Sequence, residues 1–580
     1  MEKEMENRID TYITATEMIS ALGYGTEANV LALDKGICGV QVRQDSRLSD
    51  HPVAAAVIAE EMYRTLEKRY GALPKAELLL TAVIDGLVRK SGTDLSSPDT
   101  FIVFSSTKGN VDLLDPDAGS QDEKTYLWKM GERVASHFGA GNRFCVISNA
   151  CISGVSALIV ARRLILSGNA RKVVAAGCDV LSRFIVSGFA SFRSLSQELC
   201  RPYDKSRDGL NLGEAAGAIL LSDERCEDAT VISGGAISDD ANHISGPSRT
   251  GDGLYFAMRN AMSEAGVAAS EISFLNMHGT ATVYNDEMES KAIALAGLSD
   301  VPVQSLKPYF GHTLGASGII ETVMSVEQLK RGVLWGTPGF AELGVPMPLS
   351  VSAAPRHLPM KHCVKAASGF GGCNAAIVLS LPEFVHTDAR NIYASASGYH
   401  ILRTVSVSDG KIMRDGKPVF TSASSAFGEF AREVYHASGT QYMKFFKMDN
   451  LCKLGYLTCE ELLDGLEFSP EEMALVLCNS SSSMDSDLKH LKTMEANGGE
   501  SGASPAVFVY TLPNVVSGEI CIRHRIKGEN TFFISGNDDP EKLRGYASLI
   551  LSRNGLRYCI TGWCELLGEK YTARFELLGI

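Results

Sequence analysis

The chain has 580 residues, with 55 Lys and Arg against 68 Asp and Glu, so its formal net charge is −13, and 45% of its side chains are apolar. At roughly 150 residues per domain this length allows two to four domains, and the apolar fraction excludes a disordered chain. The negative charge disfavours nucleic acid as the main partner. The first ten residues lead into no apolar signal segment, and no segment reaches the roughly 20 apolar residues of a membrane span.

The 14 cysteines are scattered singly, and no C-x-x-C pair occurs. Free Cys packs as a small buried hydrophobe, and a large chain without a signal is typical of a reducing compartment. The sequence therefore predicts a cytoplasmic protein with free thiols in place of a disulfide or zinc framework.

Up to about residue 385, short β-rich segments alternate with longer helical patterns. The expected strands are residues 100–106, 143–148, 172–177, 216–222, 272–279, 364–369 and 375–381, and the expected helices include 155–168 and 317–332. The helix from residue 155 is apolar almost all round, so it should be buried. Strands that alternate with helices predict an α/β fold with largely parallel, covered sheets.

The texture changes between residues 386 and 440, where Asp-Gly pairs at 409–410 and 415–416 are typical of hairpin turns. We interpret residues 1–385 as one domain and 386–440 as a linker with a hairpin.

Residues 441–580 then repeat part of the first domain. The matching segments are FIVFSSTKGNVD (101–112) with LVLCNSSSSMDS (475–486), RFCVISNAC (143–151) with TFFISGND (531–538), and LILSGNARKVVAAGCD (164–179) with LILSRNGLRYCITGWC (549–564). Self-similarity of this kind is a repeated fold unit, and this copy stops after the first half of the earlier domain.

Cys151 is the first candidate for chemistry, because it follows a predicted strand and comes directly before the buried helix. A thiol at a helix N-terminus faces the positive end of the helix dipole and unpaired backbone N–H groups. That setting favours the thiolate, and the same N–H groups can bind an oxyanion. Because 13 other cysteines are expected to be inert, the position alone is a weak indication.

Two histidines stand in glycine-rich corners: His278 in LNMHGTAT and His312 in SLKPYFGHTLGASG. Glycine beside a histidine lets the backbone approach a ligand closely, although a lone loop histidine is more often a surface or capping residue. Lys307 and Glu321 lie on either side of His312. The turn GFGGCN (369–374) lacks the spacing of a phosphate loop.

Taken together, these segments resemble the β-ketoacyl-acyl carrier protein synthase family, the elongating condensing enzymes of the thiolase fold, over about residues 8–385. The resembling segments are SNACISG around Cys151, RPYDKSRDGLNLGEAAG (201–217), MHGTATVYNDEMES with His278, SLKPYFGHTLGASG with Lys307 and His312, and GFGGCNAAI with Phe370. Glu321 stands where the family has a buried Glu partner of the lysine.

The resemblance implies a thiolase-like α/β fold, layered α-β-α-β-α with a duplicated βα core, and an additional C-terminal α/β half-synthase domain. It also implies the acyltransferase activity of a 3-oxoacyl-carrier-protein synthase. Cys151 would take an acyl chain from acyl-carrier protein, with its oxyanion held by the N–H groups of Cys151 and Phe370. Malonyl-carrier protein would then lose CO2, and His278 and His312 would stabilise the enolate.

The family also implies supporting roles. Lys307 would be positioned by Glu321 and would tune the field around His312, and Phe370 would gate acyl entry. No metal or organic cofactor is required. The expected partners are the acyl and malonyl forms of acyl-carrier protein and a second copy of the chain, as a homodimer, or a synthase-like subunit.

Carrier proteins are acidic, so a basic cluster is expected near the site entrance. The candidates for this cluster are Arg193, Arg201, Lys205 and Arg207.

Four residues depart from the family pattern: Ala281 replaces a Gly, Cys373 a Thr, and Asn149 and Ile152 flank the nucleophile where Thr and a small residue are usual. Ile152 is expected to narrow or bend the acyl pocket. These changes leave acyl specificity open.

Three questions of function follow. In the copy, Asp538 stands at the aligned nucleophile position, so the copy should be non-catalytic and should dock on a synthase domain. A chain-length-factor-like partner without activity is the alternative to an enzyme, and a thiolase that uses Cys373 as its second cysteine is disfavoured by Lys307. The appended half-synthase favours specialised polyene or polyketide synthesis over primary fatty-acid elongation.

Overall fold

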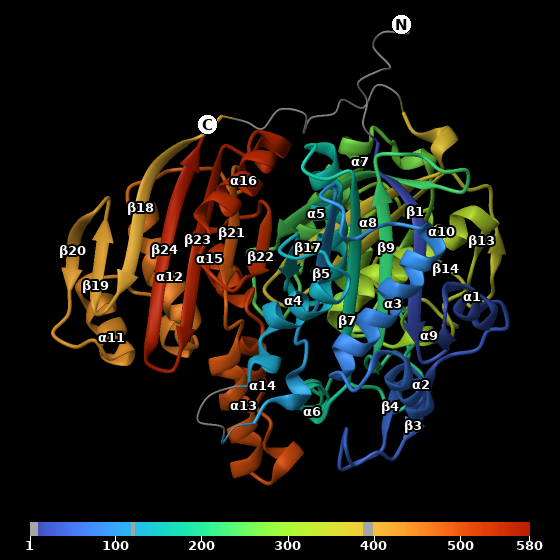
Figure 1. Cartoon of the computed structure of the whole chain (residues 1–580), viewed down its shortest axis with the longest axis horizontal. Helices are drawn as coiled ribbons and strands as arrows, with labels where there is room; N and C mark the ends of the chain where they lie inside the picture. The colour runs from blue at the N-terminus through green and yellow to red at the C-terminus, as the bar shows by residue number, and fades with distance from the viewer. Residues whose placement is uncertain (1–9, 116, 118–121, 387–397) are drawn as a thin grey trace, which may run out of the picture.

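The computed structural model describes residues 10–115, 117, 122–386 and 398–580 (Figure 1). We refer to residues 10–386 as the first unit and to residues 398–580 as the C-terminal unit.

The first sheet of the first unit consists of five strands. They are β1 (Tyr12–Ser20), β5 (Thr100–Ser105), β6 (Phe144–Ile147), β7 (Lys172–Asp179) and β9 (Ala215–Ser222). Their order is β6-β5-β7-β9-β1. The pairs β5–β6 and β5–β7 are parallel, whereas β9 runs antiparallel to both of its neighbours.

The second sheet repeats this order as β12-β11-β16-β17-β10. Its strands are β10 (Thr230–Asp239), β11 (Ile272–Asn276), β12 (Pro302–Gln304), β16 (His362–Ser368) and β17 (Cys373–Ser380), with β14 (Ser350–Val351) beyond β12. Here β17 is antiparallel to both β16 and β10. The prediction of largely parallel sheets is therefore wrong in part, because the fourth and fifth strands of each sheet pair antiparallel.

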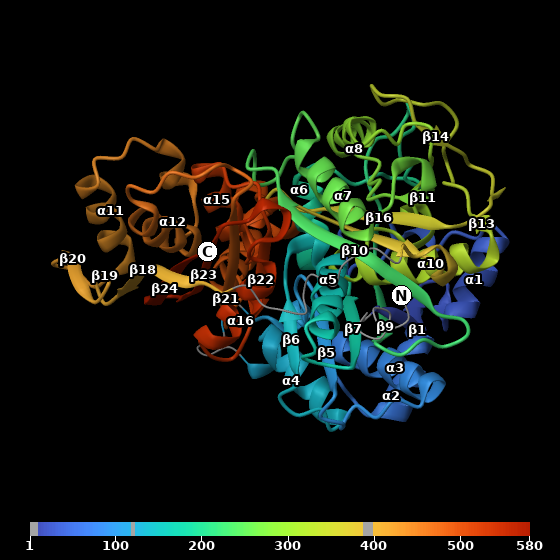
Figure 2. The same ribbon diagram turned by 90° about the horizontal axis from the view of Figure 1, so that it is seen from above.

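Helices separate and cover the sheets (Figure 2). Helices α5 (Ser153–Leu166) and α10 (Ser317–Arg331) lie between the two sheets and are buried along nearly their whole length, as the apolar pattern of α5 predicts. Helix α3 (Lys75–Ser91) covers the outer face of the first sheet, and α7 (Asp252–Ala265) covers the second. This layering confirms the expected thiolase-like architecture.

The C-terminal unit contains the same order once more, β22-β21-β23-β24-β18. Its strands are β18 (His400–Ser408), β21 (Met473–Asn479), β22 (Asn530–Ile534), β23 (Tyr558–Leu567) and β24 (Lys570–Gly579). The segments matched in the sequence fall on equivalent strands: β5 with β21, β6 with β22, and β7 with β23. The repeat is thus visible in the sheet order itself.

The predicted boundary near residue 440 is wrong, because β18 is the first strand of the copy and pairs with β24 along its length. The hairpin is present: β18 turns at Asp409–Gly410 into β19 (Lys411–Arg414), which turns at Asp415–Gly416 into β20 (Lys417–Thr421). Residues 387–397 of the predicted linker lie outside the described residues.

The remaining elements connect and cover these sheets. The other helices are α1 (Thr26–Asp34), α2 (Glu60–Tyr70), α4 (Leu127–His137), α6 (Arg183–Ser191), α8 (Val283–Leu295), α9 (Lys307–Phe310), α11 (Phe427–Ala437), α12 (Asn450–Leu463), α13 (Met484–Ala496), α14 (Pro505–Phe508), α15 (Val515–His524) and α16 (Pro540–Ile550). The short strands are β2 (Gly23–Tyr24), β3 (Val40–Arg43), β4 (Val53–Ala56), β8 (Leu212–Gly213), β13 (Val333–Leu334) and β15 (Arg356–His357).

The two units are joined edge to edge, with β22 antiparallel to β6 (Figure 2). Ser148 N donates to Phe532 O at 3.1 Å, so the pairing continues past the end of β6. Pairing of two edge strands satisfies backbone groups that would otherwise be exposed. The C-terminal unit therefore docks on the first unit of its own chain.

Within the described residues, no single helix has the length and apolar composition of a membrane span. One pair of helical segments, Pro505–Thr511 and Val515–His524, meets that standard jointly by length and composition alone, with a bend of 102° between them.

Candidate active site

The sharp turn between β6 and α5 presents Cys151 at the entrance of the buried helix. The strand ends at Ile147, and a 3-10 turn, η4 (Ala150–Ile152), leads directly into α5. Ala150 has a φ of 46°, a left-handed conformation that costs a residue with a side chain about 1–2 kcal/mol. The nucleophile candidate thus follows a strained residue.

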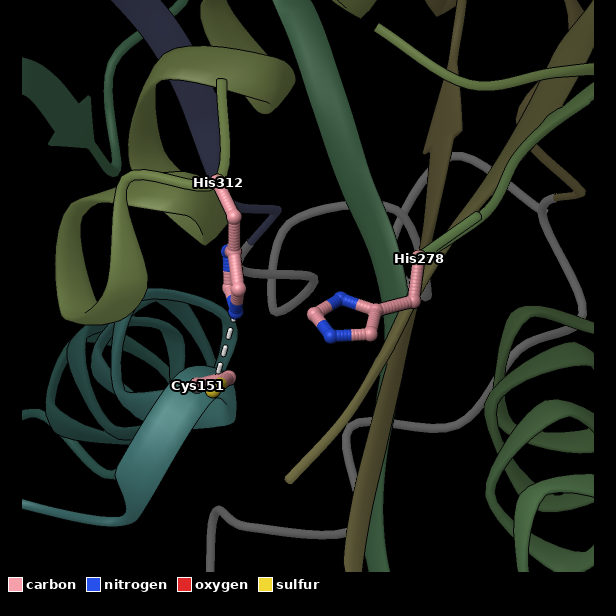
Figure 3. Close-up of side chains that lie close together, drawn as sticks. All are labelled: Cys151, His278 and His312. Carbon is pink, nitrogen blue, oxygen red and sulfur yellow. Dashed lines mark hydrogen bonds between the residues drawn. The ribbon is translucent and has the colours of Figure 1, made fainter. Parts of the chain in front are cut away.

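The structure brings the three predicted reactive side chains together (Figure 3). Cys151 Sγ lies 3.1 Å from His312 Nε2, and the rings of His278 and His312 meet edge to face with centroids 4.9 Å apart. His278 follows β11, and His312 stands between α9 and α10. The turn after β6 in the first sheet, the loop after β11 in the second sheet and the segment before α10 therefore bring these three side chains to one point.

These three residues line one cavity of about 310 Å³. Its aromatic wall consists of Phe189, Phe192 and Phe370, and Thr280 and Thr282 add hydroxyl groups. Pockets of this size, with few convergent polar groups, are typical of small-molecule sites.

Both imidazoles are nearly fully buried. Burial lowers the pKa of His278 and His312 well below the usual value, and Lys307 acts in the same direction. Both rings are therefore neutral at pH 7, with one nitrogen as a donor and the other as an acceptor.

The hydrogen bonds of His312 leave its tautomer free to change. Its Nδ1 is 3.1 Å from Ser317 Oγ, which accepts from Thr313 N at 3.1 Å. The Ser317 hydroxyl can donate to Nδ1 or accept from it. Nε2 is thus able to accept a proton from Cys151 or to donate one toward the cavity. His278 Nδ1 has no hydrogen-bond partner among the described residues.

Lys307 and Glu321 form the expected ion pair, with Nζ and Oε1 2.7 Å apart and both side chains buried. The sequence analysis missed a second lysine, Lys365, whose Nζ binds the other oxygen of Glu321. The signal for it was a lone lysine in the apolar strand VKAASG (364–369), because charged residues are almost never fully buried without a partner.

The expectation that the free thiolate of Cys151 is favoured is wrong. Burial raises the pKa of this thiol to about 12, although Lys307 acts in the opposite direction. The thiol form therefore dominates at pH 7, and deprotonation must be coupled to attack, with His312 Nε2 within reach of the proton.

The loop that carries Phe370 is held by the C-terminal unit. Asn514 Nδ2 donates to Phe370 O at 2.8 Å, and Gly371 has a φ of 92° that favours glycine. A Cβ on Gly371 would also lie 2.7 Å from Asn514 Nδ2. Phe370 stacks on Phe189, with ring centroids 6.2 Å apart.

The departures from the family pattern have distinct positions. Ala281 has a φ of 63°, so this position suits the glycine it replaces. Cys373 and Ile152 are fully buried and are not among the residues that line this cavity. Their positions argue against a narrowing by Ile152 at this cavity and against Cys373 as a second reactive cysteine.

Of the four basic residues predicted to bind carrier protein, some are buried or already paired with acidic residues. Arg207 is buried and hydrogen-bonded to Asp204 O and Gly344 O. Arg201 and Lys205 pair with acidic neighbours, and Arg193 is exposed. Arg207 is therefore a structural residue.

Asp538 occupies the nucleophile position of the copy, two residues before the first residue of α16, Pro540. Its two oxygens accept from Arg574 at 2.7 and 2.8 Å. A carboxylate held by a guanidinium cannot replace a thiolate in thioester exchange, which favours the non-catalytic interpretation of this unit.

Among the residues that the structure describes, two groups of side chains have ligand atoms within 4.8 Å of one another, close enough to hold a metal ion. One is Cys151, His278 and His312, and the other is Glu271, His362 and His386. In the second group His386 Nε2 already pairs with Glu271 at 3.2 Å, and in the first His312 contacts the thiol.

A half-buried cysteine beside two neutral imidazoles, in a duplicated fold of this strand order, is the arrangement expected of a condensing enzyme. The comparisons with known proteins agree. The model "Beta-ketoacyl synthase, N-terminal domain" matches residues 68–227, and "Beta-ketoacyl synthase, C-terminal domain" matches residues 229–341. A "Putative 3-oxoacyl-[acyl-carrier-protein] synthase, mitochondrial" of Schizosaccharomyces pombe is 33% identical over 52% of this chain and 80% of its own. The chain belongs to the beta-ketoacyl synthase family.

Two solved structures extend the likeness. A ketosynthase in complex with its chain length factor from Xenorhabdus doucetiae is 26% identical over 64% of this chain and 98% of that one, with a TM-score of 0.58. The structure "PfaC Keto synthase-Chain length factor" covers 99% of this chain and 78% of its own, with a TM-score of 0.78 and 13% identity. The second match shows a shared fold that includes the C-terminal unit.

Proposed function

We propose that the chain is an active 3-oxoacyl-carrier-protein synthase. It takes an acyl chain from acyl-carrier protein onto Cys151 and condenses it with malonyl-carrier protein, with release of CO2. The observation that carries this proposal is the contact of Cys151 Sγ with His312 Nε2 at 3.1 Å, beside His278, on one cavity.

In the acyl-transfer step, the Cys151 sulfur attacks the thioester carbonyl and the bond to the carrier sulfur breaks. The thiol proton passes to His312 Nε2 and from there to the leaving carrier thiolate. This route suits a nucleophile that rests as a thiol, because the proton leaves as the carbon–sulfur bond forms.

In the condensation step, malonyl-carrier protein loses CO2 and its thioester oxygen gains negative charge. His278 and His312, both neutral, donate hydrogen bonds to this oxygen, and in a dry cavity such donors are worth several kcal/mol. The enolate carbon attacks the acyl group on Cys151, the bond between the acyl carbon and the Cys151 sulfur breaks, and 3-oxoacyl-carrier protein leaves. The Cys151 thiolate that is released takes up one proton from water and returns to the thiol. These steps need no metal or organic cofactor.

The C-terminal unit is proposed to act as a fixed, inactive partner in the manner of a chain length factor. The fold shared with a ketosynthase–chain length factor structure over 99% of the chain supports this role, as does the arginine-bound Asp538. Such a partner favours specialised polyene or polyketide synthesis over primary elongation. We also propose a cytoplasmic location, where reducing conditions keep the 14 cysteines as thiols.

A scaffold that only supports another synthase is the competing proposal, and mass spectrometry separates the two. After exposure to a panel of acyl-carrier thioesters, Cys151 should gain the mass of one acyl group, and malonyl-carrier protein should then yield 3-oxoacyl-carrier protein. Cys151→Ala should abolish both, whereas Cys145→Ala in the preceding strand should keep both. If condensation survives in Cys151→Ala, Cys151 is not the nucleophile, and the scaffold role is then the proposal that remains.

His278→Ala separates the two half-reactions. It should still be acylated on Cys151 but should lose decarboxylation by about 10²–10³-fold, the usual effect of removing one oxyanion donor. The measurement is release of CO2 from malonyl-carrier protein. Equal loss of acylation and decarboxylation would contradict the assigned role.

A further inference from the structure

Lys365 is a second lysine that forms an ion pair with Glu321, which already pairs with Lys307. Lys365 lies in β16 and is fully buried. Its Nζ binds Glu321 Oε2 and donates to Ala366 O at 2.9 Å. The other oxygen of Glu321 holds Lys307 Nζ at 2.7 Å.

This cluster of two lysines and one glutamate carries a net positive charge if all three are ionised. Glu321 and Lys307 alone would form a neutral pair, so an ionised Lys365 adds the uncompensated charge. Burial lowers the pKa of Lys365, whereas the carboxylate of Glu321 acts in the opposite direction and favours its ammonium form. A buried charge without a partner of its own is expensive in a protein interior. Lys365 lies opposite Asn276, two residues before His278, in the pairing of β16 with β11. Its charge is therefore close to the reactive residues and calls for a role other than stability.

The neighbouring acids do not cancel this charge. Burial raises the pKa of Glu289, and it raises the pKa of Asp286, the other acid on α8, to about 7. Burial also raises the pKa of Asp179 on β7. The acids around the cavity are thus shifted toward their neutral forms. Other titratable residues near the two imidazoles are Cys151 and Tyr203, whose pKa values burial raises, and Asp240, which lines the same cavity and whose pKa burial raises to about 6.

We propose that Lys365 is a positioning residue of the condensation, which places a net positive charge behind His278 and His312. The charge acts through the two rings and does not touch the substrate. It disfavours imidazolium, which keeps both rings as neutral donors, and it stabilises the negative enolate as that charge develops. This inference rests on the proposed condensing activity.

The direction of the electrostatic effect agrees with the structure. Lys365 contributes to the lowered pKa of both His278 and His312, after burial and Lys307. Removal of its charge should therefore raise the pKa of both rings.

Two substitutions at this position separate charge from hydrogen bonding. Lys365→Met removes the charge and the donor, and Lys365→Gln removes the charge but keeps donors for Glu321 and Ala366. Each leaves Glu321 with Lys307 as a balanced pair, so both variants should fold. The rate of malonyl-carrier decarboxylation is measured against pH, with the thermal midpoint of unfolding recorded for each protein.

Both variants should lose about tenfold in kcat, less than the about 10²–10³-fold loss for a group that contacts the oxyanion. Their acidic limb should move up by about one pH unit or more, because a nearby like charge shifts a pKa by such amounts. Their thermal midpoints should be equal to or above that of the wild type.

An active wild type whose pH profile and kcat are unchanged by both variants would overturn the proposal, as would a lower thermal midpoint with an unmoved acidic limb. A change in Lys365→Met alone would also overturn it, because the hydrogen bond and not the charge would then matter. A wild type without decarboxylation would instead refute the proposed function, so the two failures are distinguishable.

Discussion

Asn149, two residues before the nucleophile, joins the two units with its side chain. Its Nδ2 donates to Asn530 O at 2.7 Å, and its Oδ1 accepts from Phe532 N at 2.7 Å. The side-chain amide of Asn149 thus makes the two hydrogen bonds that a backbone peptide group would make, and it extends the pairing of β6 with β22. Thr, the usual residue here, is too short to make both bonds.

Asn149→Ala should lower the free energy of unfolding by about 2–4 kcal/mol, because it leaves a buried N–H and a buried C=O without partners. Chemical denaturation measures this, and Asn169→Ala, at an exposed position, is the matched control. Equal stability of the two variants would show that the cross-unit bonds contribute nothing.

Asp239 makes stability depend on pH. Its carboxylate accepts from Ala241 N at 2.7 Å and from Asn530 Nδ2 at 3.0 Å, and burial raises its pKa from 3.8 to about 8. Between these values the folded chain holds a proton that the unfolded chain has released. Its contribution to stability is therefore complete below about pH 4 and is lost as the pH rises through about 8.

The free energy of unfolding should fall between pH 5 and 8 by up to about 1.4 kcal/mol per pH unit from this group. Asp239→Asn should flatten the curve, and the exposed Asp300→Asn should not. The neighbouring Asp240, whose pKa burial raises to about 6, will leave part of the slope in the variant. Parallel curves for wild type and Asp239→Asn would refute the assignment.

At the level of single residues, motif spacing predicted which side chains meet but not their protonation. The contacts of Cys151 with His312 and of Lys307 with Glu321 follow from strand–turn–helix order. The state of the thiol did not, because the depth of burial around Cys151 depends on the packing of the whole unit. Lys365 was missed because a single lysine in a short apolar strand carries no motif.

Among the elements, α14 of the C-terminal unit packs against α6 next to the aromatic wall of the cavity. Phe508 of α14 packs on Phe189 and Phe192, with ring centroids 5.6 and 6.3 Å apart. A Cβ on Gly188 of α6 would lie 2.1 Å from the Phe508 ring, so only glycine admits this contact. The C-terminal unit thus supports two aromatic residues that line the acyl site.

Phe508→Ala should open space behind Phe189 and Phe192 and allow Cys151 to accept longer acyl chains. The acyl panel with mass spectrometry measures the change in accepted length. Phe446→Ala, at a partly exposed position of the same unit, should leave the length distribution unchanged. An unchanged distribution in Phe508→Ala would show that α14 does not limit the site.

The helices and strands could be predicted where the hydrophobic periodicity was strong. The prediction failed where a strand pairs with a partner that is distant in the sequence. The strands β5, β6 and β7 and the buried helix α5 begin within two residues of the expected positions. The outer strand β18 was interpreted as linker, because its partner β24 lies more than 160 residues away in the sequence. Composition alone likewise did not indicate whether neighbouring strands run parallel or antiparallel.

For the whole molecule, the joined edge of β6 and β22 predicts that neither unit is self-sufficient. Separation would expose the edges of β6 and β22 and the buried ring of Phe508, which packs on Phe189 and Phe192 of the first unit. Residues 1–386 and 396–580, expressed separately, should each self-associate or precipitate. Size-exclusion chromatography with light scattering measures this, and a well-folded monomer of 396–580 would contradict it.

The expected homodimer of the full chain stays a prediction, and the same measurement tests it. The β6 edge is already paired within the chain, so any dimer of the full chain must use another surface. A dimer that is lost when residues on β20 are changed would place the contact at the far edge of the C-terminal sheet.

The covalent continuity of the two units has a kinetic consequence. Partners carried on separate chains dissociate on dilution and are matched only when their synthesis is matched. Here tethering converts assembly into a unimolecular step, so the ratio of the units is always one to one. Turnover per molecule should therefore stay constant from nanomolar to micromolar protein, which mass action does not allow for a two-chain complex of ordinary affinity.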